Sequence, residues 1–201
     1  MSQQEAIRAL EKEIYELGKQ LHQKRKEAPR EEVPDYPLQT LEGTTSLREL
    51  FGERDKLLVI HNMGQGCRYC TLWADGINAF LPHLESAMSV VLVSKDDPIV
   101  QRRLANNRGW RFRMASHGGG EYIREQTTQP EQGNAPGAVC YGRQDNTIVR
   151  LGSSNFGPGD PYCAMWPLLS LAGIGVEDWT PQFSYWRRPH EMDDGGANLM
   201  D

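Results

Sequence analysis

The sequence contains no apolar run long enough to cross a membrane. Its longest uninterrupted apolar stretches, Leu57–Ile60 and Val90–Val93, are far shorter than the roughly 20 residues that a spanning helix needs. The first residues, Met-Ser-Gln-Gln-Glu, also lack the apolar core of a signal peptide. We therefore expect a cytoplasmic protein that does not associate with membranes.

Basic residues are not in excess either. The chain has 22 Lys and Arg against 27 Asp and Glu, which gives a formal net charge of -5. Arginine pairs such as Arg102-Arg103 and Arg187-Arg188 are scattered, as on an ordinary solvated surface. Proteins that bind nucleic acid normally present a clustered basic surface, so no nucleic-acid partner is expected.

Cysteine is scarce, with four residues in 201. Cytoplasmic thiols are kept reduced, so these cysteines are not expected to form two static disulfides. Hydrophobic residues make up 38% of the chain and include five Trp and seven Tyr, which is enough for a real core and excludes wholesale disorder. The length fits one domain with an appended segment.

The amino-terminal segment predicts an amphipathic helix. Ser2 and Glu5 have the spacing of a capping box, in which each side chain accepts from the other residue's free amide. Apolar residues then recur at intervals of three and four, namely Ile7, Leu10, Ile14, Leu17 and Leu21. We expect this helix to pack on its own domain or on a partner subunit, which makes a homodimer plausible; a solvated, frayed arm is the alternative.

Three segments are predicted along the chain. Residues 1–35 form the amino-terminal helix or arm, which ends near Pro29 and Pro34 because proline removes a backbone amide. Residues 36–186 form the globular domain. Residues 187–201, rich in acidic residues and glycine, form a loosely held acidic tail.

Within the domain, hydrophobic patterning predicts an alternation of strands and helices. The expected elements are strands at 57–60 and 89–93, helices from 67 and from 97 to about 108, a short edge strand within 110–115, a hairpin of 138–141 with 147–151, and a last helix from 160. Residues 117–137 show no clear period and are interpreted as a lid or a mobile insertion. This order is that of the thioredoxin fold: an α/β domain with a mixed sheet flanked by helices.

Cys67 and Cys70 carry the chemistry that the sequence suggests. They follow a buried strand and a short loop, and they open a helix. Free amides and the dipole at a helix amino terminus favour a thiolate, and Arg68 adds a cation beside it. A spacing of three brings the second sulfur within about one turn of the first. We therefore predict that Cys67 is the attacking thiolate and Cys70 the more buried, resolving thiol.

Two other interpretations of the pair remain open. Both cysteines could be neutral thiols packed as small hydrophobic residues. The pair could also bind zinc; this is the less favoured interpretation, because a zinc site usually needs four ligands and Cys140 and Cys163 are isolated from each other and from any histidine pair, so no metal ligand is assigned. These two cysteines are predicted to be core residues, Cys140 on a strand and Cys163 on a helix. No cofactor is predicted.

The thioredoxin fold suggests roles for residues around the pair. His61 lies six residues before Cys67, where thioredoxins carry a buried carboxylate that handles the proton of the resolving cysteine. A histidine with a pKa nearer neutral could do the same, although a merely structural histidine is the alternative. Pro136 precedes the strand predicted at 138–141, where thioredoxin-like folds place a cis-proline that presents substrate; an ordinary turn proline is the alternative. Arg68 and Tyr69, between the cysteines, are predicted to contact substrate as well.

Several motifs together resemble the thioredoxin-like family catalogued as domain of unknown function 899. The resemblance covers roughly Glu11 to Tyr185, and its motifs are Lys24-Arg25-Lys26 with Pro29, Thr45–Gly52, Val59–Met63, Gly66–Cys70, Trp73–Gly76, Val93-Ser94, Gly109–Phe112 and Ala115-Ser116. It implies a dithiol–disulfide oxidoreductase that acts on a protein or small-molecule disulfide or thiol. Trp73 and Asp75 match the family motif, and we assign them to the architecture and local shape of the site.

The sequence departs from this pattern at two points. The loop before Cys67 is shorter than usual in the family, and Arg68 stands where such motifs often have proline, so the redox potential is not transferable. A peroxiredoxin is disfavoured because the Pro-x-x-x-Thr-x-x-Cys motif is absent from residues 60–67. A noncatalytic thioredoxin-like binding module is the alternative from another functional class.

Overall fold

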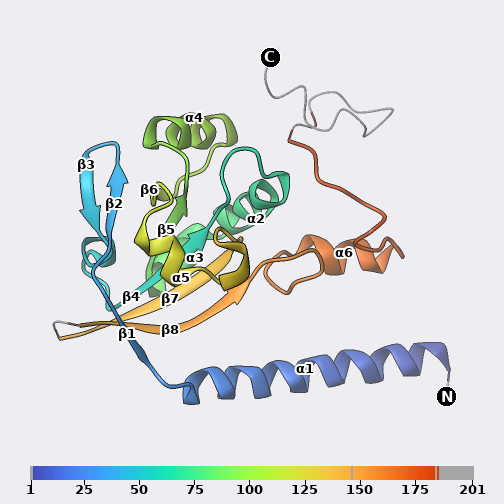
Figure 1. Cartoon of the computed structure of the whole chain (residues 1–201). Helices are drawn as coiled ribbons and strands as arrows, with labels where there is room; N and C mark the ends of the chain where they lie inside the picture. Colours follow the sequence, from blue (N-terminus) through green and yellow to red (C-terminus); the bar gives the residue numbers. More distant parts are fainter. Residues whose placement is uncertain (1, 146, 184, 186–201) are drawn as a thin grey trace.

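A computed structural model describes residues 2–145, 147–183 and 185. Its centre is one mixed eight-stranded sheet with the order β1-β8-β7-β4-β5-β6-β2-β3 (Figure 1). The strands are β1 (Glu31–Val33), β2 (Pro37–Thr40), β3 (Gly43–Ser46), β4 (Lys56–His61), β5 (Ser89–Ser94), β6 (Arg113–Ser116), β7 (Gly137–Gln144) and β8 (Thr147–Asn155).

The two central strands are the ones that the apolar runs predicted. β4 pairs in parallel with β5 and antiparallel with β7, so it has a hydrogen-bonded neighbour along both of its edges. Side chains of a strand alternate between the two faces of the sheet. Leu57 and Val59 accordingly pack into one core cluster, and Ile60 packs into the other.

One face of the sheet is covered by α2 (Arg68–Ala79), α3 (Leu81–Ala87), α4 (Pro98–Arg108) and α6 (Met165–Leu171). The core on this face is rich in aromatic side chains, among them Trp73 of α2, Trp110, Phe112, Phe156 and Trp166. α4 begins and ends as predicted: Asp97 accepts a hydrogen bond from the amide of Ile99, and Gly109 ends the helix with φ 67°.

The opposite face is covered by α5 (Glu121–Gln126) and by the chain between β1 and β4, including a 3-10 turn, η1 (Glu49–Phe51). Tyr122 and Ile123 of α5 pack there with Leu50 and Phe51. The strands β5-β4-β7-β8, with α2 and α6 on one face and α5 on the other, form the thioredoxin-like arrangement. The predicted fold class is confirmed.

α1 (Gln3–Glu27) is the predicted amino-terminal helix, and both hydrogen bonds of the Ser2–Glu5 capping box are present. None of its residues is buried. Figure 1 shows α1 outside the layers formed by the sheet and its covering helices. Within the described residues, no helix has the length and apolar character needed to cross a bilayer.

Two features in the middle of the chain differ from the prediction. The 117–137 segment is not irregular throughout: it contains α5 and a second 3-10 turn, η2 (Pro130–Gln132), and Tyr122 is only 1% exposed. β6 is not an edge strand, because the hairpin of β2 and β3 adds to the sheet beyond it through the pairing of Gln39 with Ser116.

Two boundaries also differ from the prediction. The sheet begins before residue 36, since β1 pairs with β8. The last helix begins at Met165 rather than at Asp160, because the Asp160 carboxylate accepts from the amides of Gly157, Tyr162 and Cys163 and closes a turn ahead of the helix. The predicted acidic tail, residues 187–201, lies outside the described residues.

Candidate functional site

Cys67 and Cys70 form a disulfide at the amino terminus of α2. Cys67 is the N-cap residue, and its sulfur accepts a hydrogen bond of 3.1 Å from the amide of Cys70. This amide is one of the donors that a helix leaves free at its start, so the helix itself stabilises negative charge on the Cys67 sulfur.

The two cysteines differ in exposure, and Cys70 is the more buried one, as the sequence predicted. Cys67 is half-buried, whereas Cys70 is only 3% exposed. The amide of Met63 lies 3.4 Å from the Cys70 sulfur and donates to it, so the buried sulfur also has a backbone donor. A more exposed cysteine at the helix start and a buried cysteine one turn away are the parts that thiol–disulfide exchange requires.

The loop between β4 and the pair is held by two polar side chains. The Asn62 carboxamide accepts from the amide of Gly64 at 2.8 Å, and the Asp96 carboxylate accepts from the amide of Gln65 at 2.6 Å. Gly64 has φ 114°, and a Cβ there would lie 2.8 Å from an Asp96 oxygen. The loop therefore needs glycine at this position, both for its backbone conformation and for its close approach to Asp96.

The segment before β7 closes another side of the site. Asn134 donates from its side chain to the carbonyl of Met63 at 3.5 Å, and the first residue of β7, Gly137, is in register with His61. Pro136 therefore lies at the start of β7, opposite the end of β4, where the sequence placed it. The described residues contain no cis peptide bond, so of the two alternatives for Pro136 the structure has the ordinary trans proline. Its carbonyl already accepts from the amide of Phe156 at 2.9 Å.

Of the two residues between the cysteines, Tyr69 belongs to an aromatic cluster. Its ring centroid lies 6.1 Å from that of Trp73 and 6.3 Å from that of Trp166 on α6. Trp73 in turn stacks on Phe156 at 5.6 Å. Tyr69 is half-buried, and its ring contact with Trp166 links the first turn of α2 to α6. Arg68, also half-buried, opens the first turn of α2.

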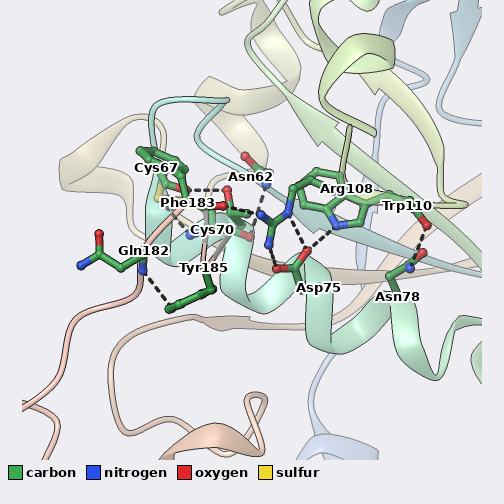
Figure 2. A network of polar contacts seen from close by, with 12 residues as sticks. Asn62, Cys67, Cys70, Asp75, Asn78, Arg108, Trp110, Gln182, Phe183 and Tyr185 are labelled. Atoms are coloured by element: carbon green, nitrogen blue, oxygen red, sulfur yellow. Dashed lines mark hydrogen bonds and ion pairs between the residues drawn. A yellow bond between two sulfur atoms is a disulfide. The ribbon is translucent and has the colours of Figure 1, made fainter. Parts of the chain in front are cut away.

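An acidic side chain anchors α2 one turn beyond the pair (Figure 2). Asp75 forms an ion pair with Arg108 at the end of α4 and accepts a hydrogen bond of 2.7 Å from the indole of Trp110. Arg108 also donates to the backbone carbonyl of Phe183, so the same cluster ties the carboxyl-terminal segment to α2. These contacts give Asp75 the architectural function that we assigned to it.

His61 is buried, but its surroundings differ from the expectation. Strand alternation directs its ring to the face with Leu57 and Val59, opposite α2, and its Nε2 lies 2.8 Å from the Tyr122 hydroxyl. Burial, with smaller effects of His117 and Arg150, lowers the pKa of His61 to about 3. With this pKa the imidazole is neutral and a weak base at pH 7, and its hydrogen-bond partner is a tyrosine of α5, which favours the structural alternative for His61.

The other two cysteines lie apart from the pair. Cys140 is half-buried on β7, and Cys163 is buried in the turn before α6 rather than on the helix itself. Burial raises the pKa of both thiols, which favours their protonated form at neutral pH. Among the described residues, no group of three or more His, Cys, Asp and Glu is placed to hold a metal ion.

Sequence reasoning missed the polar residues that support the site. Asp96 and Asn134 contact the loop before Cys67 from 31 and 71 residues away in the chain, so no local spacing could reveal them. Asn62 was part of a quoted motif, but its function of capping the amide of Gly64 becomes visible only once the loop is folded.

Solved structures similar to this chain are thioredoxin-fold proteins. A mutant of peroxiredoxin Q from Xanthomonas campestris superimposes with a TM-score of 0.53 at 18% identity, covering 68% of this chain and 91% of its own. AhpC of Enterococcus faecalis gives a TM-score of 0.51 at 14% identity, covering 74% of this chain and 93% of its own. At these identities the similarity shows the fold alone. No curated protein matches the chain.

A family assignment follows from the sequence over almost its whole length. The sequence model described as "Bacterial protein of unknown function (DUF899)" matches residues 1–192, which include α1, the Cys67–Cys70 pair and all eight strands. The chain belongs to the DUF899 family.

Proposed function

We propose that this protein is a thiol–disulfide oxidoreductase whose reactive group is the Cys67–Cys70 pair. The observation that carries the proposal is the geometry of the pair: a half-buried Cys67, whose sulfur accepts a hydrogen bond from the Cys70 amide at a helix start, is bonded to Cys70, a residue only 3% exposed. The thioredoxin-like fold supports it, since the pair lies where the central strand β4 leads into α2.

The reaction runs in two exchanges. The Cys67 thiolate attacks one sulfur of a substrate disulfide, forms a mixed disulfide and releases the other substrate sulfur as a thiolate. Cys70 then loses its proton and attacks the Cys67 sulfur, which releases the second substrate thiolate and leaves the Cys67–Cys70 disulfide. The substrate gains two electrons and the pair loses two; in the reverse direction the pair oxidises a dithiol.

The substrate class is a protein or small-molecule disulfide or thiol. We propose that Arg68, Tyr69 and Pro136 contact the substrate. Arg68 could pair with an acidic group of the substrate, and the Tyr69 ring could contact an apolar one. His61 can contribute only indirectly, because its ring lies on the sheet face opposite α2, is hydrogen-bonded to Tyr122 and, with a pKa of about 3, is a weak base.

A redox titration tests the proposal. The protein is equilibrated in glutathione buffers of graded potential, and the state of each cysteine is mapped by mass spectrometry. We expect one two-electron transition that joins Cys67 to Cys70. The variant Cys140→Ser with Cys163→Ser is the matched control and should titrate at the same potential. A pair that stays unlinked at every potential would overturn the enzyme proposal.

A trapping experiment then identifies the substrate. In Cys70→Ser the mixed disulfide on Cys67 cannot be resolved, so substrates should remain covalently attached, whereas Cys67→Ser should trap none. Hydrogen peroxide is offered in parallel, since the similar structures include peroxiredoxins. Consumption of peroxide at enzymatic rates, with no disulfide exchange, would replace the proposal by a peroxidase. Partner capture that survives loss of both cysteines would indicate a noncatalytic binding module.

A further inference from the structure

An apolar seam on α1 is left without a partner inside the chain. The seam consists of five side chains whose exposed fractions are 43% for Ile7, 60% for Leu10, 69% for Ile14, 54% for Leu17 and 47% for Leu21. Among the described residues these are five of the 14 large hydrophobic side chains that remain exposed. A contiguous apolar stripe of this kind marks an interaction surface more often than scattered apolar residues do.

The helix does not use the seam to pack on its own domain. Its hydrogen bond to the rest of the chain runs from Arg25, in the last turn, to the Tyr162 hydroxyl at 2.7 Å. Figure 1 shows the remainder of α1 extending away from the sheet. Helices of globular proteins draw most of their stability from packing of an apolar face, so a helix of 25 residues with an unpacked seam is incomplete as a monomer.

The spacing of the seam identifies the kind of partner. The intervals of three, four, three and four residues match the a and d positions of heptads, and this two-position stripe is narrower than the face with which a helix covers a globular core. A stripe of this width fits another helix that carries the same pattern. A second α1 provides one.

Charge along the helix selects the direction of pairing. From Gln3 to Glu16 there are four acidic and two basic residues, whereas from Leu17 to Glu27 there are four basic and one acidic. A parallel pair would place like charges side by side. An antiparallel pair places the acidic half of each helix against the basic half of the other, which lowers the electrostatic free energy of association.

We propose that two copies of this chain associate through their α1 helices, packed antiparallel about a two-fold axis near Tyr15 and Glu16. Leu10 of one copy then packs near Leu21 of the other, and Ile14 near Leu17. Such an interface is self-complementary and closed, so association stops at the dimer. This proposal stands on α1 alone and does not depend on the redox function.

Sedimentation velocity on the full chain tests the dimer. The chain has a mass of 22.8 kDa, and we expect twice that mass at micromolar concentration. The variant Leu10→Lys with Leu17→Lys should be monomeric. The matched control Ala9→Lys with Gln23→Lys adds the same charge at heptad positions off the seam and should remain dimeric. Circular dichroism and the Cys67–Cys70 redox titration verify that each variant has retained its folded domain.

Cross-linking tests the direction. In a background with Cys140→Ser and Cys163→Ser and with the Cys67–Cys70 pair oxidised, Ala6→Cys and Glu27→Cys chains, whose new cysteines flank the seam on the same side, are mixed and treated with a short bis-maleimide. The antiparallel arrangement predicts a cross-link between the two different chains. A dimer that gives no such cross-link would overturn the antiparallel arrangement. A wild type that stays monomeric at 100-fold higher concentration, or a dimer that survives Leu10→Lys with Leu17→Lys, would overturn the proposal as a whole.

Discussion

The hydroxyl of Tyr122 lies 2.8 Å from Nε2 of His61, and both side chains are buried. The contact continues as a chain of polar groups, since the Tyr141 hydroxyl lies 3.3 Å from that of Tyr122 and 3.0 Å from Oε1 of Gln126. Gln126 in turn donates to Tyr36 at 3.2 Å, and Tyr36 donates to Glu125 at the surface. This network joins α5 to His61 at the end of β4, the strand that leads to the Cys67–Cys70 pair.

The first prediction concerns the stability of the protein at acidic pH. The unfolded chain binds a proton on His61 below its ordinary pKa of 6.5, whereas the folded protein binds it only near 3, so the free energy of unfolding falls as pH drops from 6.5 towards 3. One such group removes about 2 kcal/mol between pH 6.5 and 5. His61→Gln should therefore lose about 2 kcal/mol less than the wild type over this interval in urea titrations.

His22→Gln is the control for that experiment, because His22 is exposed on α1. It should follow the wild-type pH dependence. The lowered pKa of His117, about 4, adds a further acid-sensitive contribution that both variants retain. Equal pH dependence in His61→Gln and the wild type would contradict the assignment of His61 as a buried, neutral group.

The second prediction concerns Tyr122, the hydrogen-bond partner of His61. Tyr122→Phe removes the hydroxyl that contacts His61 and leaves Nε2 without its partner, as Nδ1 already is. An unsatisfied buried polar group costs about 1–3 kcal/mol, so we expect a loss of that order in the free energy of unfolding. Tyr15→Phe, which removes an exposed hydroxyl on α1, should change stability by less than about 0.5 kcal/mol.

Much of the fold could be predicted where local signals coincide. α4 carries Asp97 as a cap, proline at its first position and Gly109 at its end, and each of these acts within one turn. α5 could not be predicted in this way: it has six residues, too few to show a period, and it is stabilised by burial of Tyr122 and Ile123 against distant strands. The pairing of Gln39 with Ser116 likewise depends on tertiary structure alone.

The same division applies to the site. Cys67 could be predicted as a helix cap because a strand, a loop, the pair and an apolar-periodic helix follow one another directly. The orientation of His61 could not, since a strand of unknown register gives no indication of which face carries α2. Asp96 reaches the amide of Gln65 only in the folded protein, so no spacing in the sequence indicates this contact.

The third prediction concerns the anchor of α2. Asp75→Asn removes the charge that pairs with Arg108, whose side chain is only 19% exposed, and weakens the acceptor for the Trp110 indole. Removing one partner of a largely buried charged hydrogen bond costs about 1–3 kcal/mol. Thermal unfolding and the fluorescence of Trp110 should both change. Asp55→Asn, in an ion pair whose carboxylate is 86% exposed, should leave both unchanged.

The last prediction separates two glycines of the loop before the pair. Gly64→Ala places a Cβ at 2.8 Å from an Asp96 oxygen on a backbone with φ 114°, so either the loop or Asp96 must move. Gly66→Ala meets nothing within 4 Å and has no left-handed φ, which makes it a matched control two residues away. We expect Gly64→Ala to lose about 1–3 kcal/mol of stability and Gly66→Ala much less.

Stability alone would not show that this loop serves the pair, so the rate of Cys67–Cys70 disulfide formation is measured as well. The amide of Met63, adjacent to Gly64, donates to the Cys70 sulfur at 3.4 Å, and a displaced loop withdraws that donor. Oxidation by glutathione disulfide should therefore be slower in Gly64→Ala and unchanged in Gly66→Ala. Equal rates in the two variants would mean that the loop conformation does not tune the buried sulfur, and that its glycine is there for folding only.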